Sequence, residues 1–217
     1  MARSLPIHSL ALLTAAAWLM ASGCGAPNPP AANGPPVAAA KAAAPAAEWK
    51  LTAEQEKLLG AAVTVGGLEV RAPADFRDMG QRGPGHIWVG TPRPDETYPT
   101  ATLISAPLPP DSANLPLEAL LAESMKGVRG ARKDFTESPP ERGTIQGLPF
   151  IRCKWSGGPG AGARAGLQGK TFHGIVYLGV HQGSAIQFLA QDTAPDHPRS
   201  LELLEAMAYS LRAKAAP

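Results

Sequence analysis

Cysteine is almost missing from this 217-residue chain, which has only Cys24 and Cys153. At most one intramolecular disulfide is therefore possible, and none if Cys24 is modified. A long hydrophobic run is missing as well. The longest, over 7–20, is interrupted by His8, Ser9 and Thr14 and falls short of the about 20 apolar residues that a membrane span needs. A permanent transmembrane helix is therefore the weaker interpretation of this run.

The chain also lacks a large excess of charge of either sign. All 18 acidic residues lie after position 47, and only Arg3 and Lys41 of the 20 basic residues lie before it. The region from 48 onward is therefore formally neutral. Such a domain has no basic stripe to attract a phosphate backbone, so nucleic-acid binding is disfavoured.

The N-terminus has the layout of a secretory signal. Arg3 supplies a positive end, the apolar segment 7–20 follows, and the small residues Ala21, Ser22 and Gly23 lead into Cys24. We predict a signal peptide over 1–23.

The cleavage site resembles the lipobox of bacterial lipoproteins. Ser22-Gly23-Cys24 fits that motif, whereas Ala21 stands where a larger apolar residue is usual. The resemblance implies that Cys24 becomes the acylated first residue and anchors the chain to a membrane. Gly25 is not the Asp that usually retains lipoproteins at the inner membrane, so the outer membrane, facing the periplasm, is favoured. An ordinary signal peptide that leaves a free thiol at Cys24 is the alternative.

Residues 24–47 form the next segment and consist almost entirely of Ala, Pro, Gly and Asn. They hold too little apolar bulk to fold and too many prolines for a helix, which predicts a tether. The remaining residues, 48–213, fit the size of a single domain.

Apolar periodicity and turn residues predict the elements of this domain. Thr52 and Gln55 have the spacing of a helix capping box, and Asn114 and Pro198 stand where two further helices would start. We expect helices over 52–61, 115–128 and 198–211, and strands over 67–71, 86–90, 100–106, 144–146, 149–155, 171–180 and 185–191. Strands follow one another through turns, which predicts an α+β domain with an antiparallel sheet flanked by helices.

Four segments, in this order, resemble the PsbP-like family, which is shared with a Ran-binding nuclear-import factor and a bacterial lipoprotein family. They are Gly67–Pro73 (GLEVRAP), Leu115–Val128, Thr144–Phe150 (TIQGLPF) and Ser210–Arg212 (SLR). The resemblance covers about 67–212 and implies an α/β/α sandwich. Its members mostly bind other proteins or have no known activity, so it implies no catalytic residue. The long Gly-rich stretch 157–169 and the helix at Thr52 depart from the family pattern.

Motifs of known chemistry are missing too, and we expect no catalytic, cofactor or metal site. Gly169-Lys170-Thr171 ends a Gly-rich stretch, but Arg164 stands where a phosphate-binding loop needs glycine, and a strand follows. No Gly-x-Ser-x-Gly elbow occurs. His173 with His181, or Asp192 with Asp196 and His197, could form a metal patch, although an ordinary strand, turn or loop role is the better interpretation.

Three further residues and two loops need an interpretation. Cys153 shares a strand face with Ile151 and Trp155, which predicts a buried, inert thiol. Trp88 and Trp155 are predicted to be core residues, though either could line a groove. The polar segments 78–85 and 133–142 are expected to be exposed binding loops, because loops on rigid scaffolds carry function.

We therefore expect a non-enzymatic, membrane-anchored lipoprotein whose domain meets another envelope protein. A small-molecule binder with a pocket between sheet and helices is the alternative, and a hydrolase using Cys153 or His173 is a third possibility. The sequence leaves the partner and the oligomeric state open.

Overall fold

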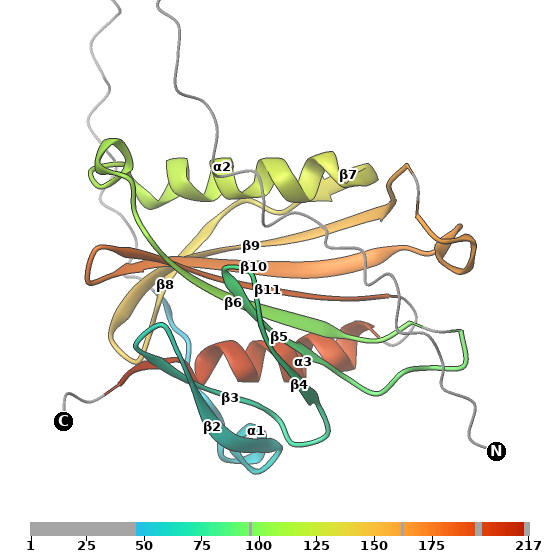
Figure 1. Ribbon diagram of the computed structural model, residues 1–217, viewed down its shortest axis with the longest axis horizontal. Coiled ribbons are helices and arrows are strands. Elements are labelled where there is room, and N and C mark those ends of the chain that lie inside the picture. Colours follow the sequence, from blue (N-terminus) through green and yellow to red (C-terminus); the bar gives the residue numbers. More distant parts are fainter. Residues whose placement is uncertain (1–46, 96, 162, 194–196, 215–217) are drawn as a thin grey trace, which may run out of the picture.

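The computed structural model describes residues 47–95, 97–161, 163–193 and 197–214. The predicted signal peptide, Cys24 and all of the tether except Ala47 lie outside these residues. The described chain forms three layers, with a large curved sheet in the middle (Figure 1). Helix α2 (Leu117–Gly130) covers one face, and helix α3 (His197–Tyr209) covers the other together with a small second sheet. The predicted α+β fold with an antiparallel sheet is confirmed.

Nine strands make up the large sheet, in the order β1-β8-β9-β10-β11-β6-β5-β4, with β7 pairing separately with β9. All neighbours are antiparallel except β1 and β8. The strands are β1 (Ala47–Glu48), β4 (Arg77–Arg82), β5 (Gly85–Val89), β6 (Thr100–Pro107), β7 (Arg132–Glu137), β8 (Glu141–Ile145), β9 (Leu148–Pro159), β10 (Phe172–His181) and β11 (Ser184–Thr193).

The small sheet has the order β12-β3-β2 and consists of β2 (Leu59–Val65), β3 (Leu68–Pro73) and β12 (Arg212–Ala213). Strands β2 and β3 turn through Gly66 and Gly67, both at positive φ, which glycine adopts without strain. Ser210 joins this sheet to the end of α3, because its Oγ accepts the backbone N–H of Arg71 at 2.8 Å. A short helix, α1 (Ala53–Lys57), precedes β2. The one-turn 3-10 helices are η1 (Pro110–Ser112) and η2 (Ala165–Leu167).

Alternation along the central strands divides the interior into two cores. On β9, Ile151, Cys153 and Trp155 pack with α2, while Phe150 packs with α3 and the small sheet. Successive strand side chains point to opposite faces, so one strand serves both cores. Both cores are filled by buried side chains, including Trp88, Tyr177 and Phe188 on the α3 side.

The capping box is confirmed, since the Thr52 hydroxyl accepts the N–H of Gln55 and Gln55 Oε1 accepts the N–H of Thr52. Several boundaries were wrong. The helix expected over 52–61 ends at Lys57, because Leu59 starts β2 and pairs with β3. Asn114 does not cap α2; Pro116 occupies that position and makes no side-chain cap.

The two segments expected to be exposed binding loops are largely strands. Residues 78–85 contain most of β4 and its turn into β5, and residues 133–142 contain most of β7 and the start of β8. Their charged, poorly alternating sequences suit edge strands, which are protected against unwanted pairing by charge and bulges. Both strands carry such a bulge, at Asp78–Gly80 and at Lys133–Thr136.

Candidate functional site

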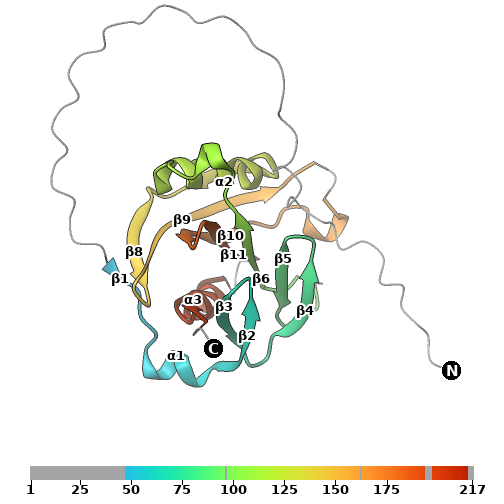
Figure 2. The ribbon, with the colours of Figure 1, turned by 60° about the vertical axis from the view of Figure 1, so that its left-hand side comes forward.

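Two long connections meet at one end of the sandwich, and we call this region the loop end. It comprises segment 90–99 between β5 and β6, segment 160–171 between β9 and β10, and the strand ends beside them. Both ribbon views place it on the side of the molecule away from β1 (Figures 1 and 2). Polar side chains that lie far apart in the sequence come together here.

Segment 90–99 is fixed to the sheet by a buried ion pair. Arg93 donates from Nη1 and Nη2 to the two carboxylate oxygens of Asp192 at 2.7 and 2.5 Å. The Asp192 side chain is fully buried, at the end of β11. Ser200 on α3 donates its hydroxyl to the same carboxylate, and the N–H of Thr193 donates to it at 2.8 Å. The bidentate geometry fixes the loop, the strand and the helix relative to one another.

A second, exposed pair joins segment 90–99 to segment 160–171. Lys170 Nζ lies 2.5 Å from Asp95 Oδ2, and the hydroxyl and N–H of Thr97 donate to Asp95 Oδ1 at 2.6 and 3.1 Å. The hydrogen bonds from Lys170 and Thr97 hold the pKa of Asp95 well below its ordinary value. The two loops of the loop end are therefore bonded to each other as well as to the sheet.

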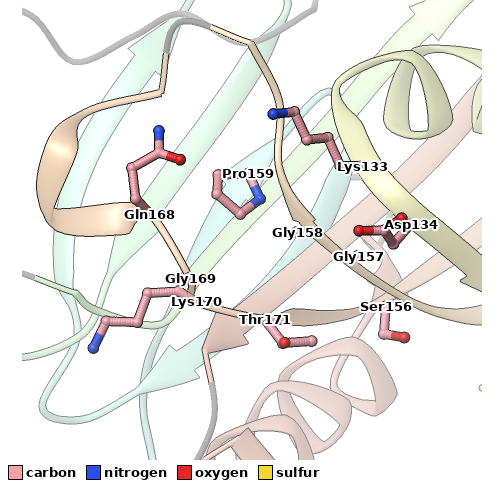
Figure 3. A pocket seen from close by; sticks show the side chains of 10 residues that line it. All are labelled: Lys133, Asp134, Ser156, Gly157, Gly158, Pro159, Gln168, Gly169, Lys170 and Thr171. Carbon is pink, nitrogen blue, oxygen red and sulfur yellow. The ribbon is translucent and has the colours of Figure 1, made fainter.

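A surface hollow of about 330 Å³ lies between segment 160–171 and the ends of β7 and β9. Figure 3 shows the ammonium end of Lys133 turned toward the side where Gln168 lies, whereas that of Lys170 points away from the hollow. Asp134 and Ser156 stand on the far wall. The hollow exists partly because Gly157, Gly158 and Gly169 contribute no side chains to its lining.

Arg132 stands beside this hollow in an unusual setting. Its guanidinium lies 5.3 Å from the ring centroid of Trp155 and 4.6 Å from that of Phe172, and it donates to Gln191 Oε1 at 2.8 Å. Burial lowers the pKa of this guanidinium. Among the described residues no carboxylate pairs with Arg132, and its buried Nε has no hydrogen-bond partner. Two aromatic rings, the Gln191 amide and the carbonyl oxygen of Ala131 hold a charge that most buried arginines share with a carboxylate.

Cys153 is buried, as predicted, with its side chain in the α2 core. The thiol donates to the carbonyl oxygen of Ser138 at 3.2 Å, and burial raises the pKa of the thiol. A thiol that stays protonated in an apolar core is a poor nucleophile. Trp88 and Trp155 are also buried, which confirms the prediction that they are core residues.

The His173–His181 pair does not form the metal patch considered from the sequence. His173 and His181 stand at opposite ends of β10, eight positions apart, and so cannot meet. His173 lies opposite Asp192 in the β10–β11 register. Asp196 and the side chain of His197 fall outside what the structure describes. Across the described residues no group of three or more His, Cys, Asp or Glu side chains could hold a metal ion.

The Gly-rich stretch does not form a phosphate-binding loop. It continues β9 as far as Pro159, passes through η2 and enters β10, with no helix opening after Lys170. The residues that do organise the loop end, Arg93, Asp95 and Lys170, carry no recognisable motif. They come together because β11 pairs with β6 on one side and with β10 on the other.

No family model matches the chain, and no curated protein sequence matches it. Comparison with solved structures is informative. The chain superposes on the cyanobacterial PsbP of Synechocystis with a TM-score of 0.52 and 15% identity, over 71% of this chain and 92% of that one. The chain has the PsbP-like fold.

Two further structures overlap less closely with this PsbP-like chain. The Ran-binding protein Mog1p of Saccharomyces cerevisiae gives a TM-score of 0.49 at 12% identity, over 71% of this chain and 95% of that one. LpqN of Mycobacterium tuberculosis, described as involved in cell envelope biogenesis, gives 0.44 at 13%, over 75% and 94%. At these identities the likeness concerns the fold alone. Within the described residues, no helix is long and apolar enough to cross a membrane.

Proposed function

We propose that this protein is a bacterial envelope lipoprotein, anchored through an acylated Cys24, whose PsbP-like domain binds another envelope protein at its loop end and catalyses no reaction. The anchor rests on the small residues before Cys24 and on the apolar segment that precedes them. The favoured site is the outer membrane, with the domain facing the periplasm. The PsbP-like fold supplies the scaffold.

The organisation of the loop end carries the binding role. Segment 90–99 is held to the sheet by the Arg93–Asp192 pair, and segment 160–171 is joined to it by the Lys170–Asp95 pair. Loops held in one conformation lose little entropy on binding, which favours recognition. Lys133 and Gln168 are exposed beside these fixed loops and available to a partner.

Catalysis is not supported by the groups present. The hydroxyl of Ser200 donates a hydrogen bond to Asp192, whose carboxylate also accepts from Arg93, so this group holds the loop and the helix in place. The thiol of Cys153 is buried and its pKa is raised. These two groups serve packing and loop attachment.

Small-molecule binding is the second candidate, and the hollow beside Lys133 favours it. Its volume of about 330 Å³ is at the lower limit of known ligand pockets. Between the sheet and α3, by contrast, lies a smaller hollow of about 230 Å³, and the packed cores fill the space around it. A ligand would therefore bind at the loop end, in an open and polar setting.

Site-specific photo-crosslinking separates the two candidates. A photoreactive residue at Gln168 in the tagged full-length protein should capture one envelope protein from native membranes. The same residue at Glu123, on the exposed side of α2, is the matched control and should capture far less. Equal capture at both positions, or none under conditions that recover known envelope complexes, would contradict the protein-binding proposal. A ligand would then be sought by its effect on the melting temperature.

The anchor is tested separately by mass spectrometry of the mature N-terminus. An acylated Cys24 is expected, together with loss of membrane association in the Cys24→Ser variant. A free thiol at Cys24 would show that an ordinary signal peptide is removed instead.

A further inference from the structure

The first described residues form a strap that docks onto the domain. Ala47 and Glu48 pair with Gly143 and Thr144 as a short parallel strand, and the N–H of Trp49 donates to Thr144 O at 2.8 Å. Strand β8 has β9 on its other side, so this strap closes one edge of the large sheet. We call residues 47–50 the strap and the surface that receives them the receptacle.

Trp49 is the main contact of the strap. Its side chain is buried, and the guanidinium of Arg152 lies 4.6 Å from its ring centroid. The ring meets that of Tyr177 edge-on, with centroids 5.4 Å apart. This is a cation–π and aromatic pocket built entirely by residues more than 90 positions away in the sequence.

The cation is itself held in place from several sides. Arg152 donates from Nε and Nη2 to Glu141 Oε2 at 3.0 and 2.7 Å, and from Nη1 to the hydroxyl of Tyr209 at 3.0 Å. Burial acts to lower the pKa of Arg152, but hydrogen bonds to Tyr177 and Glu141 raise it above its ordinary value. The receptacle therefore keeps its charge and shape from contacts that do not involve the strap.

Gly143 allows the strap to pack closely against β8. A Cβ added there would lie 2.6 Å from Ala47 O and 2.6 Å from a ring carbon of Trp49. Such distances are excluded for real side chains, so only glycine allows the strap to approach β8 this closely. The receptacle thus fits the backbone and the ring of this particular segment.

The strap is joined to the rest of the domain by a short connection. Lys50 forms an ion pair with Glu48 of the strap itself, at 2.9 Å, and Leu51 then leads to Thr52, which caps α1. A two-residue parallel ladder with one buried ring is a small cooperative unit, and such units open more readily than the whole domain. Opening would leave the edge of β8 and an aromatic pocket exposed.

We propose that the receptacle is a polypeptide-binding site and that its occupant can be the strap of a second copy of this chain. A second copy carries the same strap, so its Ala47 can approach Gly143 and its Trp49 can lie under Arg152 as in the single chain. Exchange of identical segments creates a dimer without any new interface. The proposal does not depend on the lipid anchor or on the loop end.

Disulfide trapping in the full-length protein tests the exchange. Glu48 and Thr144 are register partners, so Glu48→Cys and Thr144→Cys place two thiols within reach of a disulfide. Both substitutions are made in a Cys24→Ser background, which leaves the buried Cys153 as the only other thiol. One tagged chain carries Glu48→Cys, a second carries Thr144→Cys, and the two are mixed and oxidised mildly at increasing concentration.

A linked heterodimer that grows with concentration is expected. It should form at least about tenfold faster than with Glu123→Cys in place of Glu48→Cys, because only the strap register places positions 48 and 144 opposite each other, and disulfide formation needs Cβ atoms about 3.8 Å apart. A chain carrying both Glu48→Cys and Thr144→Cys verifies the register by closing its own disulfide. The exchange is overturned if this doubly substituted chain closes rapidly while the mixed chains give no linked dimer above the Glu123→Cys control.

Discussion

The strap end and the loop end of the large sheet are both organised around an arginine, but in different surroundings. Arg152 lies among the rings of Trp49, Tyr177 and Tyr209 and bonds to a strand, a helix and the strap. Arg93 belongs to a loop and bonds to one buried carboxylate, Asp192. The first arrangement completes a core, whereas the second holds a loop in position over a surface. At the strap end the molecule is therefore closed by its own chain, whereas at the loop end it holds polar groups at the surface.

Removing the charge at the strap end should have the largest effect. Arg152→Ala takes away the cation over Trp49 and leaves the hydroxyls of Tyr177 and Tyr209 without their charged donor, which should lower the free energy of unfolding by about 3–4 kcal/mol. Urea denaturation of the full-length protein measures it. Arg142→Ala is the control, because its pair with Glu118 is exposed and worth at most about 1 kcal/mol. Equal losses in the two variants would show that the strap end is not a core network.

The matching change at the loop end should cost less and act more locally. Arg93→Ala leaves the buried carboxylate of Asp192 with only Ser200 and the N–H of Thr193, at a cost of about 2–3 kcal/mol. Hydrogen exchange should accelerate first at the amides of Gly90 and Arg93, which bond across the loop to Pro99 and Thr97. Uniform acceleration over the whole sheet would mean that Asp192 supports the core rather than the loop.

Much of the sandwich could be predicted from local pattern. The long strands β9, β10 and β11 and the helices α2 and α3 have a clear alternation or helical spacing, because each buries one face or stripe against a core. The start of α1 was predictable because the capping box of Thr52 and Gln55 depends on residues only three positions apart.

The edges of the two sheets escaped prediction for a physical reason. Strands β4 and β7 carry charges and a bulge, and β2 is a run of small residues, so their strand character comes from pairing and not from sequence. The loop end was missed for a related reason. Arg93 and Asp192 lie 99 positions apart. They meet only because of the strand register, and no short sequence motif predicts such a contact.

Surface changes at the hollow should separate binding from stability. Lys133→Ala and Gln168→Ala remove exposed side chains and should alter the free energy of unfolding by no more than about 0.5 kcal/mol. Partner capture should nevertheless fall in both, measured as recovery of the partner when each tagged variant is affinity-purified from native membranes. Glu123→Ala, on α2, should leave both quantities unchanged. Full capture by both hollow variants would place the partner elsewhere on the molecule.

The smallest expected effect concerns the acid response of the loop end. Lys170 and Thr97 hold the pKa of Asp95 below its ordinary value. The ionised Asp95 carboxylate therefore contributes fully to the stability of the folded state above the unfolded-state pKa of about 3.9. This contribution is lost only as the pH falls through the lower folded-state pKa. The amide chemical shift of Thr97, which donates to Asp95 Oδ1, should therefore stay constant from neutral pH to about pH 4 and move only below it. Asp95→Asn should remove this late transition. A midpoint near the ordinary carboxylate pKa would instead mean that Asp95 is free in solution and does not join segment 90–99 to segment 160–171.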